Sequence, residues 1–444
     1  MMTRRRFLTR TTQASLAAAT SAFWCNSLAT RALAQAAGST YKAIVVITLN
    51  GGNDANNLLV PLNPAEYAEY SLMRGSLALP ISSLIPLNTA SGMPAYGMHP
   101  SMTNVAALYN SGRALAVAGV GPMVQPATKA QIISGAVPLP ASLLSHPVGI
   151  AQWESSQTVQ TPSTGWGGRI ADLIAQQSGS LPPVLNAGPN STFTVGNSVQ
   201  AIALQGGSLF SPLPPVLDSA VLQLAQNDAS SQNALIAQVA KFRASAMQQQ
   251  VLMDQAMQYT TLKTVFPTSA LAQTMQRIAQ MISGRSVLGA SRQIFYTQQT
   301  GYDNHANQLG THAQLLQDLD SSLGAFFAAL NELGMTNQVL VCTHSDFCRT
   351  MACNTNAGSD HAWATHQLIL GGGIRGARIL GTMPDLELGG SSDVTNPGLG
   401  MWLPTTSVTQ MASGIGNWFG LSASQLASVF PDLVNFPSGM IQLS

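Results

Sequence analysis

The stretch Ala43-Ile44-Val45-Val46-Ile47-Thr48-Leu49 is a continuous apolar, largely β-branched run that ends just before Gly51-Gly52. A short run of this kind, without polar alternation, is typical of a strand buried on both faces of a parallel sheet. Further strands are predicted at 114–120, 292–298, 338–343 and 367–370. Helical periodicity separates them, most clearly at 307–333, where Leu and Phe recur at steps of three and four. Strands that alternate with helices predict an α/β fold with a mainly parallel sheet.

The composition excludes several classes of protein. Only 8% of the 444 residues are charged and 45% are hydrophobic, which disfavours intrinsic disorder. No Lys/Arg run follows the first residues, so nucleic acid is not an expected partner. Four cysteines in a chain of this length do not form a disulfide scaffold.

The N-terminus has the features of an export signal. Thr3-Arg4-Arg5-Arg6-Phe7-Leu8 precedes an Ala/Ser/Thr-rich segment, and Ala32-Leu33-Ala34 matches a small-x-small cleavage site. We therefore expect a Tat signal peptide at 1–34, recognition by the Tat export machinery, and a periplasmic or secreted product. The segment is too polar and too short for a stable membrane anchor.

Removal of this segment changes the charge balance. It holds five of the 19 basic residues and none of the 18 acidic ones, so the remainder carries 14 basic and 18 acidic residues. An acidic surplus disfavours phosphate-rich polymers and anionic membranes as partners. Residues 35–444 are predicted to form a single domain. The Gln/Ala-rich stretch near 216–290 is predicted to be a helical insertion in it.

Acidic and His residues gather in short loops next to the predicted strands. These loops contain Asp54, Asp303 with His305, Asp346, and Asp360 with His361. Ligands bind beyond the carboxyl ends of strands in open α/β sheets. Asp and His are ligands for Zn or Mn, and carboxylates also bind Ca or Mg. We expect these six residues to converge on divalent ions, and two such ions can polarise a phosphoryl-type substrate. Taken singly, Asp54 could instead be an Asx-turn residue.

A set of short motifs in order along the chain resembles a known family. They are Gly51-Gly52-x-Asp54-x-x-Asn57, His99-Pro100, Ser145-His146, Gly165-Trp166-x-Gly168-Arg169, Tyr302-Asp303-x-His305, Ser345-Asp346-Phe347-x-Arg349 and Ser359-Asp360-His361. The chain is similar to the Tat-exported domain-of-unknown-function family 1501, sometimes labelled sulfatase-like, within the alkaline phosphatase superfamily. The resemblance covers nearly all of the chain after the signal. It implies an alkaline-phosphatase-like sheet with helices on both faces and a two-metal, hydrolase-type site.

Five positions depart from the family pattern. They are Asp346 in place of Glu, Cys348 and Ala362 in place of Gly, Asn304 in place of Thr, and Pro147 in place of Phe. The Cys/Ser-x-Pro-x-Arg motif of formylglycine sulfatases is missing from the sequence, and Cys348-Arg349-Thr350 does not match it. This disfavours a formylglycine sulfatase.

Four residues are candidates for catalytic roles, each with an alternative. Ser145 is either a nucleophile at a helix N-terminus or an N-cap, and attack by a metal-bound hydroxide would need neither. His146 beside it is a candidate ligand or acid. Arg169 and Arg349 either hold a substrate anion or form structural salt bridges.

The leading interpretation is a metal-dependent hydrolase or transferase for phosphate-, sulfate- or phosphonate-type esters. The alternative is a catalytically degenerate binding or assembly protein. His312 is expected to be structural and His366 is a further candidate ligand. Cys348 and Cys353 are close enough in sequence to pair, and Cys342 is expected to be buried in its strand.

Overall fold

The structure, a computed structural model, describes residues 41–88, 96–175, 179–204 and 233–444, together with 221, 223–224 and 226–229. The signal peptide predicted at 1–34 lies outside the described residues. Within the described ranges, no helix is both long enough and apolar enough to cross a membrane.

The central sheet is built around the apolar run. That run lies in β1 (Lys42–Asn50), and the residues 43–47 are fully buried between two parallel neighbours. The order across the sheet is β13 (Ile379–Leu380), β5 (Ala114–Gly121), β12 (Thr365–Gly371), β9 (Val339–Ser345), β1, β8 (Arg292–Thr300), β6 (Val184–Asn186) and β7 (Ile202–Ala203), with β14 (Thr406–Ser407) paired to β5. All neighbouring strands run parallel except those next to β12, so the α/β fold with a mainly parallel sheet is confirmed.

The direction of β12 affects where the polar loops lie. This strand is antiparallel to both β5 and β9, with Ile369 opposite Cys342 and Gly371 opposite Leu340. Its first residues therefore lie at the edge where the parallel strands end. The loop before β12, which carries Asp360 and His361, consequently reaches the same edge as the loops that follow β1, β8 and β9.

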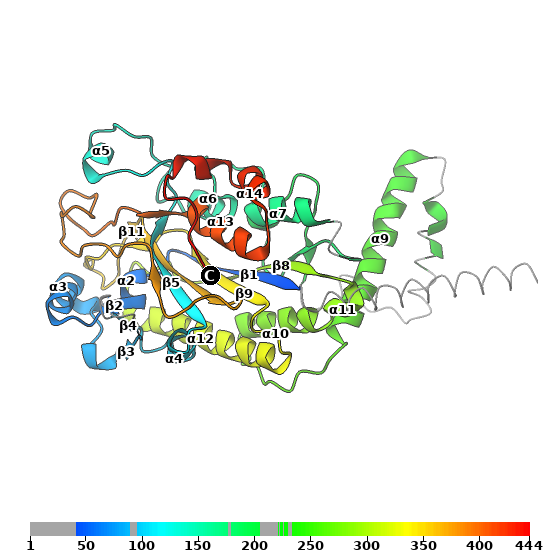
Figure 1. Ribbon diagram of the computed structural model, residues 1–444, viewed down its shortest axis with the longest axis horizontal. Coiled ribbons are helices and arrows are strands. Elements are labelled where there is room, and N and C mark those ends of the chain that lie inside the picture. The colour runs from blue at the N-terminus through cyan, green and yellow to red at the C-terminus, as the bar shows by residue number, and fades with distance from the viewer. Residues whose placement is uncertain are drawn as a thin grey trace, which may run out of the picture.

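Helices cover both faces of the sheet (Figure 1). Side chains alternate along β1: Val45 and Ile47 belong to one apolar core, and Ile44 and Val46 to the other. The first core includes α4 (Thr103–Asn110), α10 (Ala270–Ser283) and α12 (Gln308–Glu332). The second includes α6 (His146–Ser155), α7 (Trp166–Ile174), α13 (Val408–Phe419) and α14 (Ala423–Val429).

The remaining α-helices and strands lie around the central sheet and the helices that cover it. They are α2 (Ala55–Leu58), α3 (Pro64–Arg74), α5 (Lys129–Ile133), α9 (Ala234–Met257) and α11 (Arg285–Leu288), with β2 (Leu59–Pro61), β3 (Ile85–Pro86) and β4 (Tyr96–Met98) in one small sheet and β10 (Cys348–Arg349) with β11 (His361–Ala362) in another. Helix α5 is short and begins at a capping box formed by Thr128 and Gln131.

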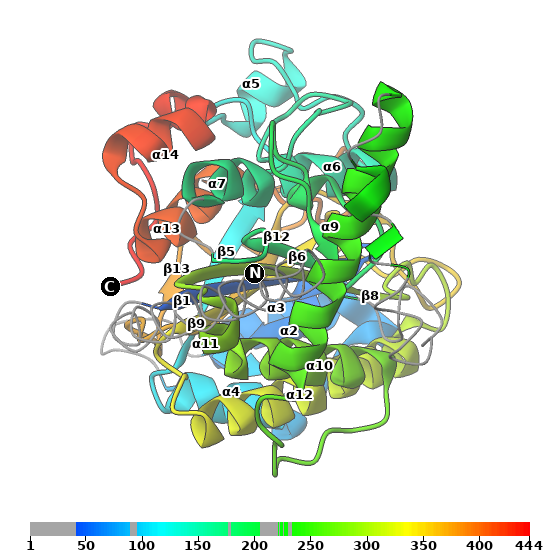
Figure 2. The same cartoon turned by 90° about the vertical axis from the view of Figure 1, so that its right-hand side faces the viewer.

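The stretch near 216–290 contains helices of two kinds. Helix α10 is a core helix that packs on α12, whereas α9 carries exposed apolar side chains, among them Leu235 and Phe242. Helix α9 lies at the far end of the molecule from α2 and β11 (Figure 1), and Figure 2 shows it from its own side. The division into one domain with an insertion stays a prediction.

Candidate metal centre

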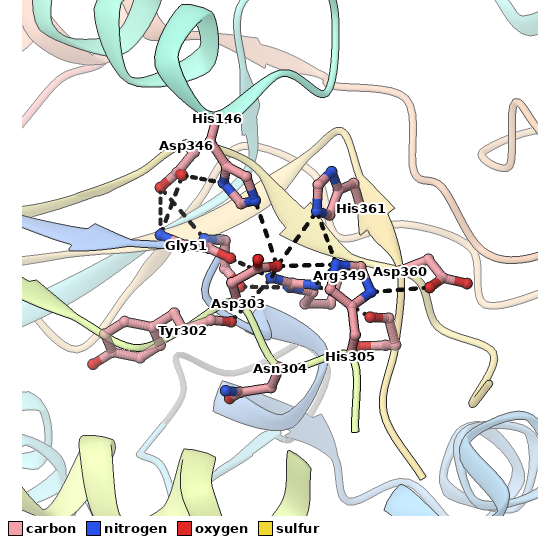
Figure 3. A network of polar contacts seen from close by, with 12 residues as sticks. Gly51, His146, Tyr302, Asp303, Asn304, His305, Asp346, Arg349, Asp360 and His361 are labelled. Atoms are coloured by element: carbon pink, nitrogen blue, oxygen red, sulfur yellow. Dashed lines mark hydrogen bonds and ion pairs between the residues drawn. The ribbon is translucent and has the colours of Figure 1, made fainter. Parts of the chain in front are cut away.

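Three imidazoles and one carboxylate meet where the parallel strands end. His146 begins α6, Asp303 and His305 follow β8, and His361 begins β11 (Figure 3). We call these four residues the histidine–aspartate cluster. The cluster reaches solvent: the side chains of Asp303 and His305 are 49% and 46% exposed, so a bulky substrate can approach it.

The Nε2 atoms of the three rings face one carboxylate oxygen. His305 Nε2 lies 3.0 Å from Asp303 Oδ1, and the Nε2 atoms of His146 and His361 each lie 3.4 Å from it. The Nε2 atoms of His305 and His361 are 3.1 Å apart. The donor atoms of His146, Asp303 and His361 also all lie within 4.8 Å of one another.

The other nitrogen of each ring has an acceptor of its own. His146 Nδ1 lies 2.6 Å from Asp346 Oδ2, His305 Nδ1 lies 3.2 Å from Asp360 Oδ1, and His361 Nδ1 lies 3.0 Å from the carbonyl oxygen of Leu144. An acceptor at Nδ1 holds the proton there, so the lone pair of a neutral ring is left on Nε2. Metal-binding histidines in proteins are oriented in this way.

These distances fit a bound ion. Zn bonds of about 2.0–2.2 Å in tetrahedral geometry place neighbouring ligand atoms about 3.3–3.5 Å apart. The two 3.4 Å separations from Asp303 to His146 and His361 match that edge. Arg349 Nη1 donates to His305 Nε2 at 3.4 Å, which leaves the lone pairs of His146 Nε2 and His361 Nε2 facing Asp303 Oδ1. This donor set favours a divalent metal.

The charges around the cluster shift its pKa values. Burial by itself raises the pKa of Asp303, but the Arg349 guanidinium and the nearby imidazoles outweigh it and lower that pKa to about 2. The hydrogen bond to Asp346 raises the pKa of His146. Burial lowers the pKa of His361, which favours its neutral, metal-binding form.

The Gly51-Gly52 turn lets the loops approach closely. Both glycines have a positive φ, of 117° and 82°. A Cβ on Gly51 would lie 2.4 Å from the backbone nitrogen of Asp303, and one on Gly52 would lie 2.8 Å from the Phe347 ring. The same turn donates both backbone N–H groups to the Asp346 carboxylate, which in turn holds His146. Larger residues at these two positions would therefore separate the loops.

The buried side chain of Arg349 holds Asp303 and the surrounding loops in place through hydrogen bonds. It is fully buried and donates to the carbonyl oxygens of Gly51, Gly52, Tyr302 and Ser359, to the Asp303 carboxylate and, at 3.4 Å, to His305 Nε2. Every donor is thus committed within the protein. These bonds position Asp303 and three loops, and a role of Arg349 in holding a substrate anion stays a prediction.

Asp54, one of the six predicted ligands, has partners outside the cluster. Its buried carboxylate pairs with the fully buried Arg74 from α3 and accepts a 2.5 Å hydrogen bond from Gln308. Asp346 and Asp360 are close to the cluster, but they contact His146 and His305 at Nδ1. The sequence therefore places three of its six proposed ligands, Asp303, His305 and His361, directly in the cluster.

Ser145 and Arg169 have different surroundings. Ser145 occupies the N-cap position of α6, as its sequence context predicted, but its side chain makes no capping hydrogen bond. Arg169 donates to the carbonyl oxygens of Ser155, Thr164 and Val429, away from the cluster residues. The hydroxyl of Ser145 is thus uncommitted, whereas the guanidinium of Arg169 stabilises the packing of α6, α7 and α14.

The other candidate residues lie apart from the cluster. His312 is buried and bonds Asn53, and His366 Nδ1 accepts the N–H of Gly119. Cys342, Cys348 and Cys353 are free thiols, the first two buried. Arg74 and Gln308 were not identified from the sequence. The one signal for Arg74 was that a buried Asp requires a cationic partner.

The family "Protein of unknown function (DUF1501)" matches residues 41–399, and the chain belongs to it. No curated protein matches the chain in sequence.

Several solved structures share its general outline. They include the lipoteichoic acid synthase LtaP of Listeria monocytogenes (10% identity, 90% of this chain and 77% of that chain, TM-score 0.33). A protein in the alkaline phosphatase superfamily from Vibrio parahaemolyticus shows 10% identity over 86% of this chain and 67% of that one, with a TM-score of 0.34. The PsFucS1 sulfatase from Pseudoalteromonas sp. shows 9% identity over 81% and 68%, with a TM-score of 0.31. At these TM-scores the similarity is distant.

Proposed function

We propose that this member of the DUF1501 family is an exported, metal-dependent hydrolase or transferase that acts on phosphate-, sulfate- or phosphonate-type esters. The observation that carries the proposal is the convergence of three imidazole Nε2 atoms on Asp303 Oδ1, with an acceptor behind each ring. His146, Asp303, His305 and His361 would hold the ion. When bound, a divalent ion supplies Lewis-acid polarisation of an ester oxygen and offsets the charge of an anionic substrate.

The chain itself contributes orientation and a candidate nucleophile. Asp346 and Asp360 hold two of the rings, and Arg349 holds Asp303. Ser145 precedes His146 at the N-terminus of a ten-residue helix, where the helix dipole favours an anion. Because its hydroxyl makes no capping hydrogen bond, Ser145 is available as the nucleophile toward an ester held at the cluster.

The test uses protein stripped of metal and reloaded separately with Zn, Mn, Ca or Mg. Each form is assayed on aryl phosphate, phosphodiester, sulfate and phosphonate esters. We expect turnover with at least one pair of metal and ester, and a loss of at least a hundredfold in Asp303→Asn. The matched control is Asp385→Asn, which changes an exposed aspartate on another loop and should keep full turnover.

Two outcomes would contradict the proposal. Equal turnover in wild type and Asp303→Asn would show that the cluster is not the site. Metal binding without turnover on any ester would favour the alternative, a binding or assembly protein for exported material.

A further inference from the structure

The carboxylate of Asp54 has a permanent cationic partner. Arg74 is fully buried and pairs with Asp54 Oδ2. Its other donors are also used: Nε donates to Asn57 Oδ1 at 3.1 Å, and one terminal nitrogen donates to the carbonyl oxygens of Thr350 and Met351 at 3.0 and 3.1 Å. A guanidinium stays charged at any ordinary pH, so this partner cannot leave by losing a proton.

The groups around Asp54 do not form a metal site. Its Oδ2 also accepts from Gln308, and its Oδ1 has no partner. Gln308 is fixed in turn, because its Oε1 accepts the hydroxyl of Ser359. In the part of the chain that the structure describes, Asp54 belongs to no group of three ligating side chains. One free carboxylate oxygen is too few for a divalent ion, which takes at least four ligands.

The net charge around Asp54 also differs from the net charge around the histidine–aspartate cluster. The charges of Asp54 and Arg74 cancel, so the pair offers no net attraction to a divalent ion beside it. The cluster has three carboxylates within or directly behind it, from Asp303, Asp346 and Asp360, against the one guanidinium of Arg349. The surplus of negative charge lies at the cluster alone.

We propose that the chain binds one divalent ion, at the histidine–aspartate cluster, and that the buried guanidinium of Arg74 takes the place of a second ion beside Asp54. This inference rests on the proposed function for the first ion and departs from the two-ion site that the family resemblance implies. A single ion held by the cluster would then supply the Lewis-acid chemistry of the site. The fixed positive charge of Arg74 serves the fold around α3 instead.

The experiment is a count of ions per chain. Full-length processed protein is loaded with Zn, freed of excess metal by gel filtration, and measured by native mass spectrometry and elemental analysis. We expect one ion in wild type and none in Asp303→Asn. Asp54→Asn leaves Arg74 buried without its partner, so the double variant Asp54→Asn/Arg74→Met is used, which removes both charges together. It should still bind one ion.

The outcomes separate the two proposals. Two ions in wild type, falling to one in the double variant, would overturn the single-ion inference and leave the metal centre intact. Loss of the one ion in the double variant but not in Asp303→Asn would place the metal at Asp54 and overturn the inference. No bound ion in correctly folded wild type would overturn both.

Discussion

Replacement of Arg349 by lysine tests whether this residue organises the site or binds the substrate. Besides His305 Nε2, the guanidinium donates to five oxygen acceptors, namely the carbonyl oxygens of Gly51, Gly52, Tyr302 and Ser359 and the Asp303 carboxylate. A lysine ammonium has three donors, so Arg349→Lys leaves at least two of these acceptors unpaired. At about 1–3 kcal/mol for each unpaired buried acceptor, the loss of stability is ~2–6 kcal/mol.

The expected change in melting temperature follows from the size of the chain. An unfolding entropy of about 2.1 cal/mol/K per residue over about 400 residues gives a shift of about 1.2 °C per kcal/mol, so the melting temperature should fall by about 2–7 °C. The measurement is differential scanning calorimetry of metal-free protein, which excludes any contribution from bound metal.

Arg169→Lys is the matched control, because Arg169 is also bonded to backbone carbonyls but lies away from the cluster. Both variants should lose stability, and Arg349→Lys alone should also weaken Zn binding. An unchanged melting temperature together with a KM raised tenfold or more would show that Arg349 contacts the substrate, and would refute the reasoning.

Three further predictions concern the nucleophile, a pKa and export. Ser145→Ala should change stability by less than about 0.5 kcal/mol, because no cap is lost, while turnover falls by several orders of magnitude; turnover within threefold of wild type would remove Ser145 as nucleophile. In metal-free protein, Asp346→Asn should lower the pKa of His146, followed by NMR of the ring proton, because the hydrogen bond to Asp346 raises it. The raised pKa of His146 stabilises the folded state below pH 6.5, and this contribution is lost as the pH rises through the pKa of the folded protein. Asp346→Asn should therefore be less stable than wild type at pH 6. An unchanged pKa of His146 in the variant would contradict the geometry. Replacement of Arg5 and Arg6 by lysine should leave unprocessed precursor in the cytoplasm, and normal delivery would exclude the Tat route.

The sequence predicted the sheet better than the contacts at its edge. The apolar run in β1 could be read directly, since a strand buried on both faces needs uninterrupted apolar residues. The helix α12 was equally clear, because Leu316, Leu319 and Leu323 recur on one face and are fully buried. The antiparallel direction of β12 could not be read, because a seven-residue strand has the same pattern in either direction.

The candidate site was predicted in outline only. Position after a strand was enough to bring Asp303 and His305 to this edge of the sheet, since parallel strands end there. His361 precedes β12 and reaches the edge because that strand is antiparallel. The position of a residue after a strand does not show whether its side chain points at the facing Nε2 atoms or at the Nδ1 side of a ring. For this reason Asp346, which contacts His146 Nδ1, was grouped with the ligands. The partner of Asp54 depends on how α3 packs, which no local pattern near Arg74 encodes.

The central claim, that the histidine–aspartate cluster binds a metal ion, is tested most directly by anomalous X-ray diffraction at the Zn edge from crystals grown with Zn. The account predicts an anomalous peak about 2.0–2.2 Å from His146 Nε2, Asp303 Oδ1 and His361 Nε2. A map without a peak there, or with its strongest peak beside Asp54 and Arg74, would contradict it.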